Sequence, residues 1–288
     1  DGAGPGGPEA ARVAAERGQA VTVLEAADAP GGQIRLTARQ ERRREMLAIV
    51  DWRHVQCVKL GVTFQFNTWA EAEDVLATAP DLVIVATGGL PGTGALTEGA
   101  AEVVTAWDIL AGDVKPGAEV LVFDEAGDHA GLMAAQAAVQ AGARVEIVTP
   151  DRSFAPEVMG MNLVPYVRAL QAAEARFTVT WRLAAVRREG NRLRAVLGSD
   201  YGPAQLERLV DQVVVNHGTL PLDELYFALK PLSRNLGEVD TAALLEGRPQ
   251  ALRRNPAGAF ELFRIGDAVA ARNTHAAILD ALRLLRTN

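Results

Sequence analysis

Residues 2–7 read Gly-Ala-Gly-Pro-Gly-Gly, and a helical stretch from Glu9 to Arg17 follows them directly. Within the loop, three glycines have the G-x-G-x-x-G spacing of a dinucleotide-binding turn. Backbone N–H groups at a helix N-terminus can bind a pyrophosphate only where no Cβ atom blocks its approach. We therefore expect a pyrophosphate to lie along this loop, which is formed by Gly2, Gly4, Pro5, Gly6 and Gly7.

An acidic residue follows the loop at the distance that a ribose-binding residue requires. The predicted strand over residues 20–24 ends at Glu25, about twenty residues after the loop. A carboxylate in this position accepts hydrogen bonds from the ribose hydroxyls of adenosine, and its charge disfavours a 2′-phosphate. The sequence therefore predicts FAD, or ADP in the same site. Pro8 is tolerated here because the first turn of a helix leaves its N–H groups unpaired.

Short apolar runs alternate with alanine-rich helical stretches along the chain, which is typical of a parallel sheet with crossover helices. We expect an α/β fold with two Rossmann-like dinucleotide-binding domains of the three-layer ββα type, the second inserted in the first. The first domain covers residues 1–112 and returns at 257–288, and the second covers 113–256. The strands are expected at 20–24, 62–66, 82–86, 119–123, 144–148, 177–180, 183–188, 192–197, 208–215 and 260–265, with helices at 9–17, 42–60, 71–77, 132–141 and 274–286.

Charge and cysteine content exclude several classes of protein. A formal net charge of −7 over 288 residues disfavours a nucleic-acid partner. No apolar run approaches the ~20 residues that span a bilayer, so we expect no membrane partner. The single cysteine, Cys57, excludes an internal disulfide and a cysteine-ligated iron–sulfur cluster within this chain, and it fits a cytoplasmic protein. His54 and His129 lack partners at metal-ligand spacing, so no metal site is expected.

Five segments together resemble a known group of flavoproteins. The glycine loop, Val-Thr-Val-Leu-Glu at 21–25 and Pro-Gly-Gly-Gln-Ile at 30–34 are joined by Val-Ala-Thr-Gly-Gly at 85–89 and Arg-Ile-Gly-Asp-Ala at 264–268. The sequence resembles the C-terminal portion of the trimethylamine dehydrogenase, histamine dehydrogenase and 2,4-dienoyl-CoA reductase group, which includes N-methylproline demethylases. The resemblance covers essentially the whole chain.

The resemblance implies a division of labour between this chain and a preceding domain. In the group, an N-terminal (β/α)8 barrel carries FMN and a 4Fe–4S cluster and performs the substrate chemistry. We therefore expect such a barrel in the same polypeptide, an electron-transfer protein as acceptor, and no catalytic residue in residues 1–288. Only Asp1 precedes Gly2, whereas the glycine loop of a doubly wound sheet follows a strand. The missing strand is expected to come from an absent N-terminal portion or from another segment.

The resemblance also assigns further cofactor contacts. Two of these residues also have a structural interpretation: Trp69 could be a packing residue, and His275 could simply be a residue at the start of a helix. Gly32 and Gln33 are assigned to the phosphates or the flavin, Thr68 and Trp69 to the adenine, Ala86, Thr87 and Gly88 to the crossing beneath the pyrophosphate, Gly266 and Asp267 to the ribityl chain, and His275 to the helix whose N-terminus faces the flavin.

The second nucleotide loop differs from the first. Residues 124–131, Asp-Glu-Ala-Gly-Asp-His-Ala-Gly, lack the glycine triplet and place three carboxylates where a pyrophosphate would lie. Like charges in a partly desolvated site repel by kilocalories per mole, so NAD(P)H binding is doubtful. Three interpretations follow: an FAD-containing portion of an amine dehydrogenase or demethylase, a non-catalytic ADP-binding module, and an NAD(P)H-dependent flavoprotein reductase, which the acidic loop disfavours.

Overall fold

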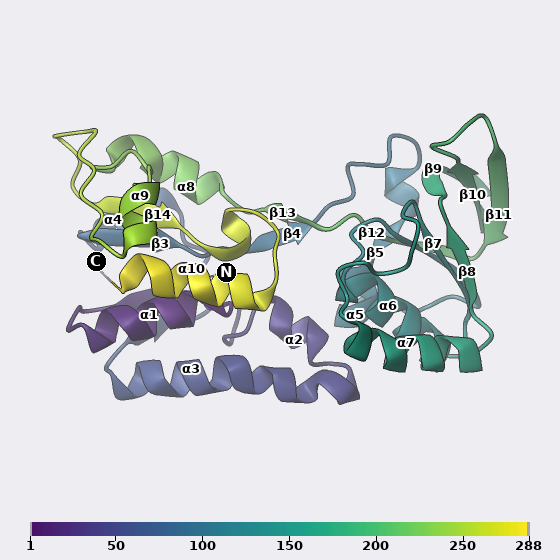
Figure 1. Ribbon diagram of the computed structural model, residues 1–288, viewed down its shortest axis with the longest axis horizontal. Helices are drawn as coiled ribbons and strands as arrows, with labels where there is room; N and C mark the ends of the chain where they lie inside the picture. The colour runs from purple at the N-terminus through teal and green to yellow at the C-terminus, as the bar shows by residue number, and fades with distance from the viewer. Residues whose placement is uncertain (1, 287–288) are drawn as a thin grey trace. The chain divides into compact units, whose positions relative to one another are not determined.

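The computed structural model describes residues 2–286, which form two compact units (Figure 1). Unit 1 contains residues up to 38, residues 42–90 and residues from 219 onward, and unit 2 contains residues 39–41 and 91–218. The chain leaves unit 1 at β4 (Gly89–Pro91) and returns at β13 (Thr219–Pro221), and these two strands pair with each other. The predicted α/β fold, with the second unit inserted in the first, is confirmed.

Unit 1 is built on two parallel strand pairs. β1 (Thr22–Leu24) pairs with β2 (Thr63–Gln65), and β3 (Leu82–Val85) pairs with β14 (Glu261–Arg264). The helices of unit 1 are α1 (Gly6–Glu16), α2 (Gln33–Thr37), α3 (Ala48–Lys59), α4 (Ala72–Ala77), α8 (Glu224–Leu229), α9 (Thr241–Glu246) and α10 (Thr274–Leu285).

Alanines allow the helices of unit 1 to pack closely around the glycine loop. Ala10 and Ala14 of α1 are buried against Ala281 and Leu285 of α10, together with Phe263 of β14. On its other side, α1 contacts α3 and β1 around the buried Cys57. The thiol of Cys57 donates a hydrogen bond to the Pro8 carbonyl, and burial raises its pKa to about 11. Cys57 is therefore an inert core residue at neutral pH.

Unit 2 contains a parallel five-stranded sheet of order β5-β12-β6-β7-β8. Residues 120 and 122 of β6 point to one face, where α6 packs, and residues 121 and 123 point to the other, where the antiparallel strands β9, β10 and β11 pack. The elements are β5 (Val104–Thr105), α5 (Ala106–Ala111), β6 (Glu119–Asp124), α6 (His129–Gln140), β7 (Arg144–Thr149), α7 (Gly160–Ala172), β8 (Arg176–Val179), β9 (Arg182–Glu189), β10 (Arg192–Gly198), β11 (Gln205–Val210) and β12 (Gln212–Asn216).

Several predicted elements need correction. The single strand expected at 208–215 is two strands that separate at Asp211, because β11 pairs antiparallel with β10 while β12 joins the parallel sheet. Asp211 makes the break by accepting the Glu119 N–H on its carboxylate and donating its own N–H to the Glu119 carbonyl. The helix expected over 42–60 is a 3-10 helix until Leu47 and α-helical only from Ala48.

The predicted domain limits also differ from the compact units. The expected boundaries at 112/113 and 256/257 lie later than the divisions after Leu90 and Gly218. β5 pairs with β12, which places residues 91–112 in unit 2, and α8 contacts β14, which places residues 219–256 in unit 1. No helix among residues 2–286 is both long and apolar enough to cross a bilayer.

Candidate nucleotide-binding site

The glycine loop is held by close approaches that only glycine permits. A Cβ atom on Gly7 would overlap the carbonyl oxygen of Gly2, and a Cβ on Gly2 would lie 2.5 Å from the carbonyl oxygen of Leu24. Around Gly4, in contrast, a Cβ would meet no atom within 4 Å. The chain itself therefore requires glycine at positions 2 and 7, whereas Gly4 leaves open space at the N-terminus of α1, where an anion is stabilised.

Glu25 ties the end of β1 to the glycine loop. Its Oε2 accepts the Ala3 N–H at 2.6 Å and its Oε1 accepts the Ala27 N–H at 2.8 Å. The next predicted contact, Thr68, donates its N–H to the Glu25 carbonyl at 2.8 Å. Glu25 is only 1% exposed, so a ribose can reach the carboxylate only if the surrounding loop opens. The sequence did not predict that Glu25 anchors the glycine loop to the end of β1.

Two predicted residues that lie 234 positions apart are in direct contact. Gln33 Nε2 donates a hydrogen bond to Asp267 Oδ2 at 2.9 Å, and the Arg272 N–H binds the other oxygen of Asp267 at 3.1 Å. Gly32 has φ +49° and its Cβ position is 3.2 Å from Gly4 Cα. These contacts bring both Gln33 and Asp267 to the side of the glycine loop.

The start of α10 also borders the loop. A Cβ on Gly6 would lie 3.2 Å from the Ala277 carbonyl oxygen, and a Cβ on Gly266 would lie 3.2 Å from Ala277 Cβ. Asp280 links α10 to the Gly-Asp segment because its Oδ2 accepts the Gly266 N–H at 3.0 Å. Asp280 was not predicted from the sequence, because its spacing from the Gly-Asp motif is the only feature that indicates it.

The Ala-Thr-Gly segment at 86–88 lies against the glycine loop. The Gly7 Cβ position is 3.6 Å from Ala86 Cβ. The Thr87 hydroxyl donates to the Leu222 carbonyl, and the Leu222 N–H donates to the Gly88 carbonyl at 3.0 Å. Thr87 and Gly88 therefore tie this segment to Leu222, while Ala86 lies beside Gly7.

Trp69 and His275 lie at the periphery of the group. Trp69 is 65% exposed, and with Thr68 it lines a cavity of unit 1. His275 is exposed in the first turn of α10, where Asn273 caps the helix by accepting the Ala276 N–H. No hydrogen bond or ring contact within residues 2–286 joins His275 to the glycine loop, and its helix-start position agrees with the alternative interpretation.

The acidic residues of the second loop are bound by the chain's own donors. Asp124 accepts hydrogen bonds from the Asn216 Nδ2 at 2.8 Å and from the Gly127 N–H at 3.1 Å. Asp128 caps α6 by accepting the Ala130 N–H at 2.8 Å, and the same Asn216 amide donates to it at 2.9 Å. A Cβ on Gly131 would lie 2.5 Å from the Asp124 carboxyl carbon, so this carboxyl group occupies the first turn of α6.

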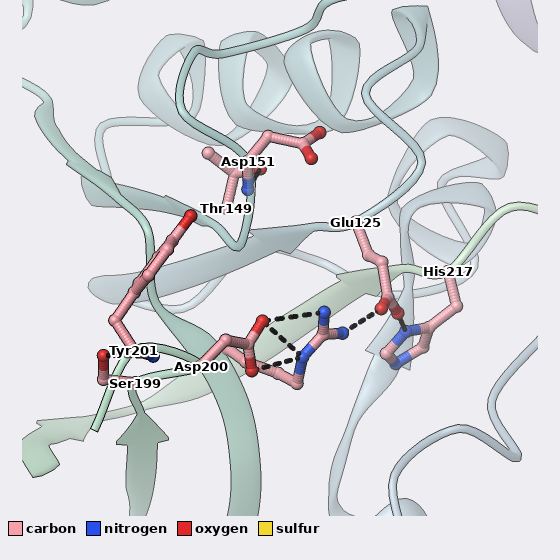
Figure 2. A network of polar contacts seen from close by, with 8 residues as sticks. Glu125, Thr149, Asp151, Ser199, Asp200, Tyr201 and His217 are labelled. Atoms are coloured by element: carbon pink, nitrogen blue, oxygen red, sulfur yellow. Dashed lines mark hydrogen bonds and ion pairs between the residues drawn. The ribbon is translucent and has the colours of Figure 1, made fainter. Parts of the chain in front are cut away.

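Glu125 enters a second network at the same end of the sheet (Figure 2). It accepts a hydrogen bond from His217 Nδ1 at 2.7 Å and forms an ion pair with Arg182, which also binds Asp200. Burial alone raises the pKa of Glu125, but the bonds from His217 and Arg182 outweigh it and lower that pKa. All three acidic residues therefore bind donors of unit 2 itself, and the Asp124 carboxyl group lies against the first turn of α6.

Asp124 makes the stability of unit 2 depend on pH. Burial, reinforced by the charge of Asp128, raises the pKa of Asp124 from 3.8 to about 7. The folded protein then holds this proton more tightly than the unfolded chain, so the free energy of unfolding falls as pH rises from about 4 to about 7. We expect Asp124→Asn to remove this pH dependence. At pH 8 its free energy of unfolding should exceed that of the native chain by on the order of 3 kcal/mol.

Urea unfolding of the native chain and of Asp124→Asn at pH 5 and pH 8 measures this difference directly. Comparing the two proteins cancels the pH dependence of the other carboxylates. A constant difference between them at both pH values would show that Asp124 is ionised throughout.

Known proteins similar to this chain include a demethylase and two dehydrogenases. No model of a protein family matches the chain. The chain is 66% identical over 285 residues to a probable N-methylproline demethylase of Rhizobium meliloti (strain 1021). The match covers 99% of the chain and 42% of the demethylase. The predicted resemblance is confirmed: this chain is a homologue of the demethylase, dehydrogenase and reductase group.

Further similarities agree with this result. The chain is 45% identical over 296 residues to an N,N-dimethylglycine/sarcosine dehydrogenase of Chromohalobacter salexigens, covering 99% of the chain and 43% of the relative. Histamine dehydrogenase from Rhizobium sp. 4-9 shares the fold with a TM-score of 0.80 at 23% identity, over 99% of the chain and 42% of that structure. The chain therefore spans less than half the length of each of these three proteins, which are named as one demethylase and two dehydrogenases.

Proposed function

We propose that unit 1 binds FAD and forms the dinucleotide-binding, electron-transfer portion of a flavin-dependent amine dehydrogenase or demethylase. The observation that carries this proposal is the convergence of distant segments on one glycine loop. Glu25 binds Ala3, Gly32 lies against Gly4, Ala86 lies against Gly7, and α10 lies against Gly6. The sequence predicts each of these segments at a dinucleotide site.

The residues present fit such a cofactor. The open space at Gly4 and the N-terminus of α1 would receive the pyrophosphate, and Glu25 would bind the adenosine ribose once its carboxylate is exposed. Asp267, held by Gln33, would bind the ribityl chain. The N-terminus of α10 would stabilise negative charge on the reduced flavin. When bound, FAD would supply hydride and single-electron transfer.

The length of the relatives supports a larger working unit. The chain covers 42–43% of the demethylase and dehydrogenase relatives. We infer that an additional N-terminal domain, an FMN-binding (β/α)8 barrel with a 4Fe–4S cluster, carries the substrate chemistry. The names of these relatives favour N-methylated amino acids as the substrate class. The internally occupied second loop favours electron delivery to a protein acceptor over exchange with NAD(P)H.

Nucleotide titration of the chain tests the binding site. We expect FAD and ADP to bind, and Gly4→Val to weaken both at least 10-fold without lowering the melting temperature, because a side chain at Gly4 meets only the space reserved for phosphate. The matched control is Gly202→Val, at an exposed glycine of unit 2 whose Cβ position has no neighbour within 4 Å and whose φ is not positive. Unchanged affinity in Gly4→Val would remove the pyrophosphate from this loop.

The same contacts permit a second function, a structural module that holds ADP alone. The glycine loop and Glu25 recognise the part of FAD that ADP shares, so binding of ADP alone does not distinguish the two. FAD gains the contacts of Asp267 and α10. We expect Asp267→Ala to weaken FAD at least 10-fold and to leave the affinity for ADP unchanged, whereas equal effects on both would favour the structural module.

A further inference from the structure

Helix α3 is apolar on both of its sides. Toward the interior of unit 1 it buries Val50 and Cys57, and it packs beside α1 (Figure 1). On the opposite side Trp52, Val55 and Val58 are 52%, 47% and 57% exposed. A helix on the surface of a soluble protein ordinarily presents polar residues on that side. The exposed side of α3 therefore has the character of a surface that packs against another element.

The exposed residues of α3 are arranged around one row along the helix. Asp51, Val55 and Lys59 are four positions apart, so they lie in line on one ridge of the helix surface. Trp52 and Val58 flank this row on its two sides, three positions before and after Val55. We refer to these five residues, all of them exposed, as the α3 stripe. Its middle is apolar, and its two ends carry opposite charges.

Trp52 is held in position by two cations. The guanidinium carbons of Arg12 and Arg53 each lie 5.7 Å from the centroid of the Trp52 ring. Both arginines bind the buried Glu9, Arg12 at 2.6 Å and Arg53 at 2.7 Å. An indole that is already ordered loses little conformational freedom when a partner covers it. Tryptophans of this kind are typical energetic anchors of protein interfaces.

The α3 stripe is complementary to a second copy of itself. A twofold axis beside Val55 reverses the direction of the helix, so Asp51 of each copy lies beside Lys59 of the other. This pairing forms when the two rows run side by side, as in the commonest class of helix packing, at a crossing angle of about 50°. In a parallel pair, Asp51 would meet Asp51 and Lys59 would meet Lys59. The charges therefore favour the antiparallel arrangement and disfavour the parallel one.

We propose that the α3 stripe is a dimerisation surface, on which α3 of a second copy of this chain packs antiparallel. The two Val55 side chains lie at the axis, the Trp52 rings cover the apolar middle, and two Asp51–Lys59 pairs form the rim. The stripe is much smaller than a standard interface of about 20–30 residues per partner, so we expect a weak dimer with a Kd on the order of 10–100 µM. This inference goes beyond nucleotide binding and does not depend on it.

Charge reversal tests the direction of the pair. Sedimentation equilibrium of the full-length polypeptide at low ionic strength, where exposed charge pairs contribute most, measures the Kd of self-association. We expect Asp51→Lys to raise this Kd about 10-fold, because both rim pairs become repulsive, and Lys59→Asp to do the same. An equimolar mixture of these two variants restores both attractive pairs, so it should associate within about 3-fold of the native Kd.

The variant Val55→Cys reports on the axis itself. Two such cysteines meet at the axis, so mild oxidation should give a disulfide-linked dimer in an amount that rises with protein concentration. The native Cys57 does not compete, because it is buried and its pKa is raised to about 11. The matched control is Val164→Cys, at an exposed valine of α7 in unit 2, which should give no linked dimer.

Recovery of association in the mixture, together with a disulfide at position 55, supports the proposal. No association at about 500 µM, well above the expected Kd, would overturn it. A Kd that neither charge reversal changes, or equal cross-linking at position 164, would overturn it as well. Protection of Val55→Cys from a maleimide at every dilution would show that another part of the longer polypeptide covers the stripe, which also contradicts the proposal. None of these outcomes depends on FAD or ADP, so this test and the nucleotide titration can fail independently.

Discussion

Replacing Gly7 with alanine is expected to destabilise unit 1 by roughly 3 kcal/mol or more and to abolish nucleotide binding. The added methyl group would overlap the Gly2 carbonyl oxygen, which is backbone and cannot rotate aside. The loop must therefore move away from the N-terminus of α1, and overpacking of a closely packed site costs about 1–3 kcal/mol or more. The same movement displaces the N–H groups that we propose bind phosphate.

Denaturant unfolding and FAD titration of Gly7→Ala measure both effects. Gly4→Ala is the matched control, because its methyl group meets no atom within 4 Å and should leave stability within about 0.5 kcal/mol of the native chain. Equal stability of the two variants would mean that the Gly2–Gly7 approach is absent in solution.

Glu25→Ala is expected to lower stability by about 3–5 kcal/mol and to reduce the affinity for FAD and ADP at least 100-fold. Removal of the carboxylate leaves the buried N–H groups of Ala3 and Ala27 without acceptors. An orphaned buried donor costs about 1–3 kcal/mol, and more where its partner was charged. The nucleotide loses the acceptor of its ribose hydroxyls at the same time.

Glu25→Gln separates the two roles of this side chain. The amide keeps the shape and can accept one of the two N–H groups, but its NH2 faces the other, so an intermediate loss of stability is expected. Glu16→Ala is a matched acidic control, since this exposed residue forms an ion pair with Arg12 that should contribute below 1 kcal/mol. If Glu25→Ala were as stable as Glu16→Ala, the buried carboxylate would not anchor the loop.

The parts of the site that could be predicted from sequence are those with local causes. The glycine loop, the acid at the end of β1 and the Gly-Asp segment are each specified by a few adjacent residues whose conformation limits the side chain. The helix of α10 was expected from residue 274, where the structure begins it. α1 begins at Gly6, three residues before the predicted start. The helix can include Pro8 because a proline in the first turn costs no intrahelical hydrogen bond.

The remainder depends on contacts between distant positions. The partner of Asp124 is Asn216, 92 residues away, and the partner of Gln33 is Asp267. No spacing in the sequence identifies such pairs, so the hydrogen bonds that unit 2 donates to these acidic residues were not predicted. The acidic residues were interpreted only as repelling a pyrophosphate. Strand 208–215 was predicted as one element for the same reason, since only the two sheets reveal the break at Asp211.

The most direct test of the central claim is the identity of the nucleotide released when the purified full-length polypeptide is denatured, measured by chromatography and mass spectrometry. One FAD per chain is expected, lost in Gly7→Ala and retained in Gly202→Ala. Release of ADP without FAD would contradict the electron-transfer role, and release of no adenine nucleotide would contradict the nucleotide site itself.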